Sequence, residues 1–182
     1  IFANKEENTK HDIDILQAFC NVWVSDIHNF RDALRMIGDI GTITGRIEKS
    51  KQIVQQLEAD KAHFLTRVCR QKSALYLIWK GPYMSAGRDT FIHDMMQTAG
   101  FNNVETRSRY PVLQDDELRA MSPELVLLSS EPYPFRQKHI DELQILLPQA
   151  TIILVDGELF SWYGSRLLRS FDYFSALHEQ IL

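Results

Sequence analysis

Apolar and polar positions follow two different patterns along the chain. Residues 29–70 contain no proline, and their apolar side chains recur every three or four positions, which predicts helix. On both sides, short apolar runs alternate with loops and amphipathic segments, as in β-loop-α units. As one continuous helix, residues 29–70 would extend about 60 Å at 1.5 Å per residue, which is longer than a crossover between neighbouring parallel strands needs. We therefore expect a helical spine that joins two α/β lobes.

The spine carries its own signals for a start and an interruption. Asn29 is a suitable N-cap, because its side chain can accept a hydrogen bond from an unpaired N–H of the first turn. Gly41 and Gly45 weaken the helix, so we predict a break near residues 43–45 and a second helix over residues 46–70. Lys, Glu and Gln occupy one side of that second helix, which indicates packing along one flank only.

The remaining pattern predicts two lobes of unequal size. Before the spine we expect a helix over residues 9–19 and a short strand over 22–24. The expected later strands cover residues 74–79, 103–104, 125–128 and 151–155, and the expected helices cover 89–99, 115–121, 135–146 and 162–182. We predict an α/β fold with a remnant of a first lobe (1–29), the spine (30–72) and a Rossmann-like second lobe with a parallel sheet (73–182).

The composition is that of an ordinary globular protein. Of 182 residues, 45% are hydrophobic and 24% charged, and the formal net charge is −4. This balance, without a basic patch that contains aromatic residues, gives no reason to expect a nucleic-acid partner. No apolar run approaches the roughly 18–20 residues that span a bilayer. Cys20 and Cys69 lack metal-ligand spacing, so we interpret both as core thiols.

The amino terminus resembles the end of a buried strand. The apolar residues Ile1, Phe2 and Ala3 are followed directly by a polar loop over residues 4–8. We therefore expect the chain to be a fragment or a processed product of a longer parent. A signal peptide of that parent would precede Ile1.

The sequence contains no catalytic signature. It has no G-x-G-x-x-G, no P-loop and no G-x-S-x-G motif, and its six histidines form neither H-x-x-x-H nor H-x-H. His93 and His139 each stand alone on a predicted helix, where we expect an exposed or internally hydrogen-bonded side chain. We predict no enzyme, no cofactor and no metal site.

The loops that follow the predicted strands are unusually aromatic. Exposed loops normally favour small polar residues, so aromatic side chains with scattered Arg and Glu indicate a surface for an amphipathic ligand. Some of these rings will instead anchor the loops onto the core. The loop residues predicted to contact ligand are Trp79, Tyr83, Met84, Arg88, Tyr110, Glu158, Trp162 and Tyr163.

In the order and spacing of these segments, the chain resembles the helical-backbone (class III) periplasmic substrate-binding proteins of ABC importers. Members of that family carry vitamin B12, iron-siderophores, haem or metal ions. Residues 22–26 resemble the last strand of the first lobe, residues 79–90 the first ligand loop of the second lobe, and residues 156–166 the last. The resemblance extends over essentially the whole chain, is nearest to the vitamin B12-binding branch, and implies that about 60–70 residues of the usual first lobe are absent.

The resemblance also implies roles for single residues. The sites that contact B12 in that branch fall on Asn4, Met84, Tyr110, Glu158 and Trp162. Asn4 replaces the family's Trp, and Trp162 replaces its Arg. Family members present one acid on each lobe to arginines of the permease, in a transient, salt-sensitive contact. Asp116 matches the acid of the second lobe, whereas the first-lobe position is Lys10, so Glu6 or Glu7 would substitute.

Our first hypothesis is therefore a solute-binding protein of an ABC import system. It would capture a corrinoid, iron-siderophore or haem between its lobes as a monomer, with small hinge motion, and deliver it to the permease. The full-length parent would be periplasmic or a cell-surface lipoprotein.

Two alternatives remain. An α/β enzyme could bind a phosphate-containing ligand near Ser85, Ala86, Gly87 and Arg88, ahead of a helix N-terminus. Direct binding of a metal ion is disfavoured because His and carboxylate residues are not clustered.

Overall fold

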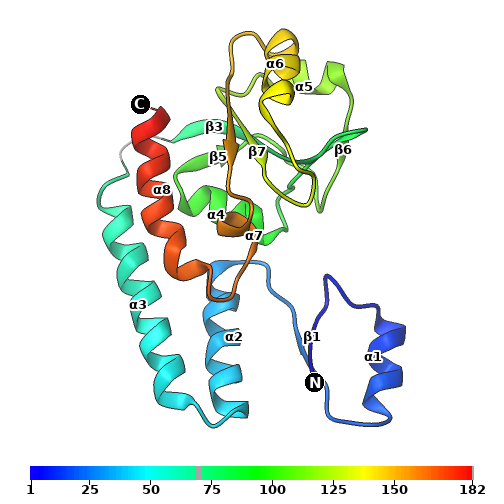
Figure 1. Cartoon of the computed structure of the whole chain (residues 1–182), viewed down its shortest axis with the longest axis vertical. Coiled ribbons are helices and arrows are strands. Elements are labelled where there is room, and N and C mark those ends of the chain that lie inside the picture. Colours follow the sequence, from blue (N-terminus) through cyan, green and yellow to red (C-terminus); the bar gives the residue numbers. More distant parts are fainter. Residues whose placement is uncertain (69–70, 182) are drawn as a thin grey trace.

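The computed structural model describes residues 1–68 and 71–181 and confirms the predicted α/β fold. Figure 1 shows a small unit with β1, α1 and β2 set apart from a larger body. The elements in chain order are β1 (Phe2–Asn4), α1 (Lys10–Gln17), β2 (Trp23–Ser25), α2 (Phe30–Ile43), α3 (Ile47–Leu65), β3 (Lys72–Trp79), β4 (Tyr83–Ser85), α4 (Phe91–Thr98), β5 (Phe101–Asn103), β6 (Val112–Leu113), α5 (Asp115–Met121), β7 (Leu125–Ser129), α6 (Gln137–Leu146), β8 (Thr151–Val155), α7 (Glu158–Ser161) and α8 (Leu167–Ile181).

The larger sheet is built around the buried strands β3 and β7. Its order is β6-β4-β3-β7-β8, and β5 pairs with β3 beside β4. β3, β5, β7 and β8 run parallel, as predicted, whereas β4 runs antiparallel to β3. Tyr83–Ser85, part of the segment that we expected to be a ligand loop after the strand over 74–79, forms the strand β4 instead. Gly81, which follows β3 directly and turns the chain at φ +86°, was the local indication that a second, antiparallel strand follows.

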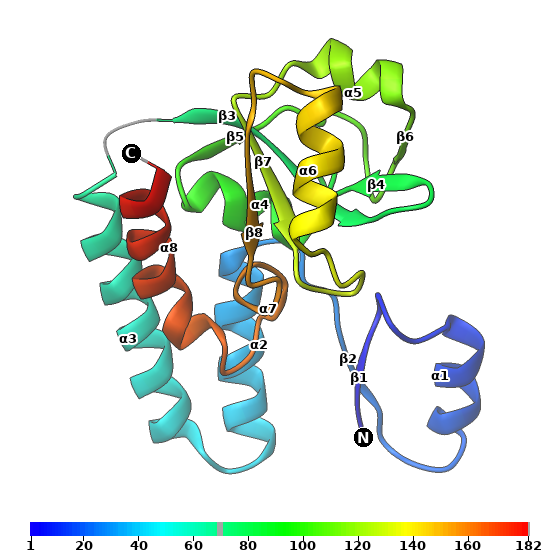
Figure 2. The same cartoon turned by 45° about the horizontal axis from the view of Figure 1, so that its top comes forward.

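Two apolar layers cover the two faces of this sheet. Side chains alternate along a strand, so Tyr76 of β3 faces one layer while Leu75 and Leu77 face the other. The first layer joins the sheet to α3, α4 and α8 through residues that include Phe64, Phe171 and Phe174. The second joins it to α5 and α6 through residues that include Leu118, Val126 and Leu143. Figure 2 shows α6 on one side of the sheet and α3 with α8 on the other.

Residues 29–65 form a helical hairpin, not a single extended spine. Asn29 caps α2 as predicted, since its Oδ1 accepts from the N–H of Asp32 at 3.0 Å. The predicted break is confirmed as well: α2 ends at Ile43, Gly45 turns at φ +68°, and α3 begins at Ile47. α3 then returns beside α2 and leads to β3 (Figure 1). The 19 residues of α3 extend about 28 Å, so the run does not reach the roughly 60 Å of a single continuous helix.

Other sequence expectations need smaller corrections. The last helix, expected from residue 162, begins only at Leu167 as α8, and the short helix α7 before it was not predicted; Leu182 lies outside the described residues. Cys20 is exposed and therefore not a core thiol, and Cys69 also lies outside the described residues. β1 pairs in parallel with β2, but Phe2 is half exposed, because this two-stranded sheet has a small core. The proposed division into residues 1–29, 30–72 and 73–182 stays a prediction.

Within residues 1–68 and 71–181, no helix combines the length and the apolar character that crossing a membrane requires.

The close contact of α2 and α3 gives a test of the hairpin. A Cβ on Gly41 would lie 2.0 Å from Oγ of Ser50, whereas a Cβ on Gly38 would meet nothing within 4 Å. We expect Gly41→Ala to lower the free energy of unfolding by about 1–3 kcal/mol through overpacking. Gly38→Ala, the matched control, should raise it by about 0.5–1 kcal/mol through helix propensity. Urea denaturation measures both, and equal stability of the two variants would contradict the packing described.

Candidate functional site

A cavity of about 760 Å³ lies where the small unit faces the larger body. This volume is within the range of about 300–1,000 Å³ that is usual for small-molecule sites. The cavity adjoins the carboxyl end of β3 and the loops after β7 and β8, which is where open α/β sheets bind ligands. Its lining residues are Asn4, Glu6, Glu7, Met36, Ile78, Phe91, Ile92, Arg109, Tyr110, Glu131, Pro132, Ser161, Trp162, Tyr163 and Gly164.

Only part of the predicted ligand-binding set lines this cavity. Asn4, Tyr110, Trp162 and Tyr163 do so, and they come from β1, the loop before β6 and the segment after α7. The predicted residues Trp79, Tyr83, Met84, Arg88 and Glu158 are absent from its lining. Their contact with a ligand stays a prediction.

Local contacts account for the position of those five residues. Trp79 packs edge-on against Tyr133, with ring centroids 5.5 Å apart. Tyr83 and Met84 belong to β4 and pair with β6. Arg88 is exposed, and Glu158 forms an ion pair with Arg166.

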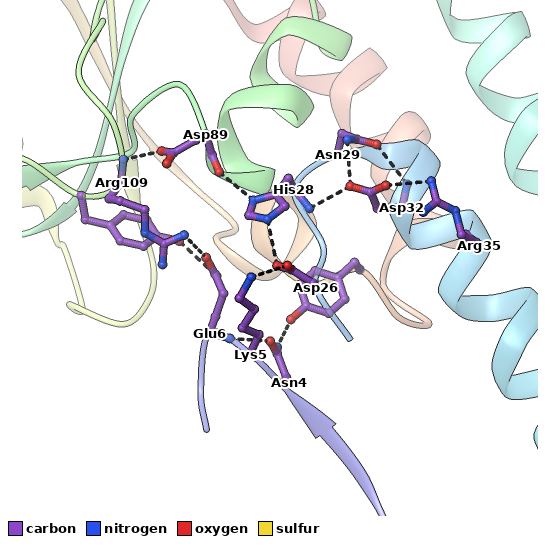
Figure 3. A network of polar contacts seen from close by, with 12 residues as sticks. Asn4, Lys5, Glu6, Asp26, His28, Asn29, Asp32, Arg35, Asp89 and Arg109 are labelled. Carbon is purple, nitrogen blue, oxygen red and sulfur yellow. Dashed lines mark hydrogen bonds and ion pairs between the residues drawn. The ribbon is translucent and has the colours of Figure 1, made fainter. Parts of the chain in front are cut away.

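The most polar part of the cavity joins the two lobes directly. Glu6, from the loop after β1, reaches Arg109 of the larger body, with Oε1 and Nη1 2.9 Å apart (Figure 3). The Tyr110 hydroxyl donates to Glu6 Oε2 at 3.4 Å, and the Arg109 guanidinium lies 5.5 Å from the centre of the Tyr110 ring. Sequence reasoning identified Glu6 and Tyr110 separately but missed Arg109, although Arg109 is adjacent to Tyr110 in the sequence.

Tyr163 lies beside this cluster. Asn4 Nδ2 donates to its hydroxyl oxygen, and its ring meets Phe91 edge-on at 5.3 Å. Burial, with a smaller contribution from Glu6 and Glu7, raises the pKa of Tyr163 to about 12. Burial and the Glu6 carboxylate also raise the pKa of Tyr110 above its ordinary value. Both phenols are therefore neutral hydrogen-bonding groups at ordinary pH.

Glu131 organises another part of the cavity lining. Its Oε1 accepts from Trp162 Nε1 at 2.6 Å and from Ser161 Oγ at 3.2 Å. The indole of Trp162 is thus held in one direction although half of its surface is exposed. A fixed, accessible ring beside a polar anchor suits the flat apolar face of a ligand. Nothing in the sequence indicates the role of Glu131 beyond its place in an aromatic loop.

A second polar contact ties the lobes together at His28 (Figure 3). Its Nε2 lies 2.8 Å from Asp26 Oδ1, and its Nδ1 lies 3.0 Å from the carbonyl oxygen of Asp89. Asp26 also pairs with Lys5 at 2.5 Å, and the Asp89 carboxylate accepts from the main-chain N–H of Arg109. The same residues therefore connect β2, the segment before α4 and the loop that carries Arg109.

The acids predicted to dock the permease lie in different surroundings. Asp116 is almost fully exposed at the start of α5 and pairs with Arg119 at 2.8 Å. Glu7 is exposed as well. Glu6 is partly buried and paired with Arg109. The docking role of these three acids stays a prediction, and Glu7 is the first-lobe acid that is free to meet a partner surface without leaving Arg109.

The loop proposed for phosphate binding is already saturated with internal hydrogen bonds. The Gly87 N–H donates to the carbonyl oxygen of Arg109 at 2.7 Å, and the Arg88 N–H donates to that of Arg107 at 2.9 Å. The N–H groups of Ser85 and Ala86 are also bound to carbonyl oxygens. No main-chain donor of residues 85–88 remains to hold a phosphate, so this loop gives no support to the enzyme hypothesis.

His93 and His139 are satisfied within the protein, as predicted. His139 is buried and its Nδ1 accepts from the N–H of Arg136 at 2.9 Å, while burial lowers its pKa. His93 Nδ1 lies 3.1 Å from Asn103 Nδ2. In the described part of the chain, His, Cys, Asp and Glu form no group of three or more that could hold a metal ion.

The raised pKa of Tyr163 predicts a loss of stability at alkaline pH. A phenol with a folded-state pKa of about 12 stays protonated where the unfolded phenol, with a pKa of about 10, ionises. Its contribution is complete below about pH 10 and is lost as the pH rises towards 12. We expect Tyr163→Phe to show a smaller decline in unfolding free energy over this interval, measured by urea titration. Tyr133→Phe, outside the cavity lining, is the control, and identical pH slopes for Tyr163→Phe and wild type would contradict the assignment.

Comparison with known proteins agrees with this geometry. The family model described as periplasmic binding protein matches residues 1–145. The haem-binding protein RhuT from Roseiflexus sp. RS-1 is 16% identical with a TM-score of 0.79, over 97% of this chain and 72% of that one. The haem-binding protein HutB of Vibrio cholerae is 17% identical with a TM-score of 0.79, over 97% and 75%. The vitamin B12-binding protein BtuF of Vibrio cholerae is 13% identical with a TM-score of 0.78, over 99% and 75%.

A comparison with curated proteins gives no significant match. The family match covers well over half of the residues, and the structural similarity extends over nearly all of them. The chain therefore belongs to the periplasmic binding protein family.

Proposed function

We propose that this protein is the solute-binding component of an ABC import system and carries a corrinoid, an iron-siderophore or haem. The observation that carries the proposal is the cavity of about 760 Å³ between the two lobes, whose lining combines four aromatic with four charged side chains. The haem and vitamin B12 ligands of RhuT, HutB and BtuF support this class of ligand. The protein would act in the periplasm or as a lipoprotein at the cell surface.

The lining divides the expected ligand contacts between apolar and polar groups. Trp162, Tyr163 and Phe91 would cover the apolar faces of a large chelate. Asn4, Arg109 and Glu131 would meet its polar edge. A carrier must also release its ligand. Because the contact between the lobes is largely polar, one lobe can rotate slightly relative to the other, which would open the cavity.

Delivery to the permease would use the exposed acids. Glu7 lies on the first lobe and Asp116 at the start of α5 on the larger body. Exposed acids of this kind favour a fast, salt-sensitive encounter with a basic partner surface over a tight complex.

Ligand binding can be tested with haemin, ferrichrome and cyanocobalamin by isothermal titration calorimetry. We expect at least one of them to bind at micromolar concentration, and Trp162→Ala to weaken that ligand about tenfold or more because a fixed aromatic contact is lost. Trp79→Ala is the informative comparison, since this ring packs on Tyr133 outside the cavity lining. A large loss of affinity in Trp79→Ala without one in Trp162→Ala would mean that the ligand binds outside this cavity. No binding by any of the three compounds would contradict the proposal.

Docking can be tested with the permease reconstituted in nanodiscs. We expect the double variant Glu7→Lys, Asp116→Lys to bind about tenfold more weakly than wild type at low salt, and the difference to shrink as salt is raised. Glu48→Lys, an exposed acid on α3, is the control for charge reversal. Equal affinity of the double variant and wild type in surface plasmon resonance would argue against docking through these acids.

A further inference from the structure

We propose that Arg109 and Tyr110 form a subsite for a carboxylate group of the ligand, and that Glu6 of the same chain occupies this subsite until the ligand displaces it. The inference rests on the proposed function and deepens it, because it selects ligands that carry a free acid group. Glu6 then acts as an internal competitor that lowers the affinity for such ligands.

Arg109 is held in place by its main chain and not by Glu6. Its N–H donates to the Asp89 carboxylate, and its carbonyl oxygen accepts from the Gly87 N–H at 2.7 Å. Its φ of +61° lies in the left-handed region, which is uncommon for a residue with a Cβ and is found preferentially at functional sites. The guanidinium lies near the Tyr110 ring, and the side chain is about half exposed, so a ligand can reach it.

Glu6 is an imperfect occupant of this position. Its Oε1 lies 2.9 Å from Arg109 Nη1, yet this buried oxygen makes no hydrogen bond of good geometry. Its second oxygen receives only a long hydrogen bond of 3.4 Å from Tyr110. A carboxylate aligned with the guanidinium fork would accept two parallel hydrogen bonds, which are stronger and more specific. A ligand carboxylate that reaches this alignment therefore gains more than Glu6 loses.

The charges of the cavity make Arg109 the group that an acidic ligand must reach. The lining contains three carboxylates, Glu6, Glu7 and Glu131, and one guanidinium, that of Arg109. An acidic ligand is repelled by the three acids unless it pairs with Arg109. The Glu6 side chain can leave Arg109 without unfolding the structure around it, because it lies on a short loop in which the next residues, Glu7 and Asn8, are exposed.

The test compares probes that differ in free carboxylates. Haemin and ferric citrate carry them, whereas haemin dimethyl ester and ferrichrome do not. We expect Glu6→Gln to tighten binding of the acid-bearing probes about tenfold and Arg109→Gln to weaken it about tenfold or more. Both substitutions should change binding of the probes without an acid by a clearly smaller factor, because those probes cannot replace Glu6 at Arg109. In the double variant, Glu6→Gln should have no further effect, because its competition requires Arg109.

Matched controls separate local effects from overall charge and folding. Arg169→Gln removes the same charge from an exposed position on α8, and thermal unfolding verifies that each variant is folded. The inference is overturned if Glu6→Gln weakens binding of haemin, which would make Glu6 a ligand contact. It is also overturned if Arg88→Gln, but not Arg109→Gln, weakens binding, or if haemin and its dimethyl ester respond alike in all variants. Failure of all four probes and of cyanocobalamin to bind wild type would instead contradict the proposed function itself.

Discussion

The position of the first lobe depends on the contact of His28 with both sides of the interlobe boundary. The two partners of its ring, the Asp26 carboxylate and the Asp89 carbonyl oxygen, belong to different lobes. The neighbouring Ile27 is buried in the main apolar core, so apolar packing as well as hydrogen bonding holds the connection between β2 and α2 in place. The cavity depends on this arrangement, because Asn4 and Glu6 reach the larger body only if β1 and β2 keep their direction.

The structure separates the tasks of apolar and polar residues. Burial of the aromatic residues of α3 and α8 against the sheet stabilises the larger body, and none of this depends on a ligand. The interlobe boundary, by contrast, is crossed by single polar contacts, among them those of Glu6 with Arg109 and Tyr110 and that of His28 with the Asp89 carbonyl oxygen. Such contacts each contribute little to stability. A protein built in this way can change the relation of its lobes without disturbing its core.

The sequence predicted the elements of the larger body well, because each has strong local signals. The bounds of α5 and β8 agree with those expected, since Pro123 and Pro148 limit the neighbouring segments. β4 was missed because three residues give too short a pattern, and the reversal of α2 and α3 was missed because hydrophobic periodicity predicts a helix but not its direction after a turn.

For the site, the sequence indicated some of the side chains that line the cavity, such as Tyr110 and Trp162, but also several that lie outside its lining. Ile78 lines it whereas the adjacent Trp79 packs on Tyr133, because successive residues of a strand point to opposite sides. A continuous apolar run in the sequence does not indicate which of its residues will point toward the cavity. Arg109 and Glu131 were missed because their directions depend on a left-handed backbone position and on a partner from another loop.

The left-handed conformation of Arg109 sets a limit on how this loop can be improved. Such a backbone costs a residue with a Cβ about 1–2 kcal/mol relative to glycine, so glycine would relax the loop and make the protein more resistant to heat. The same replacement would remove the single guanidinium that the cavity lining provides. Thermal stability and ligand recognition therefore conflict at this position. A variant selected for thermal stability alone would be expected to lose its discrimination among solutes.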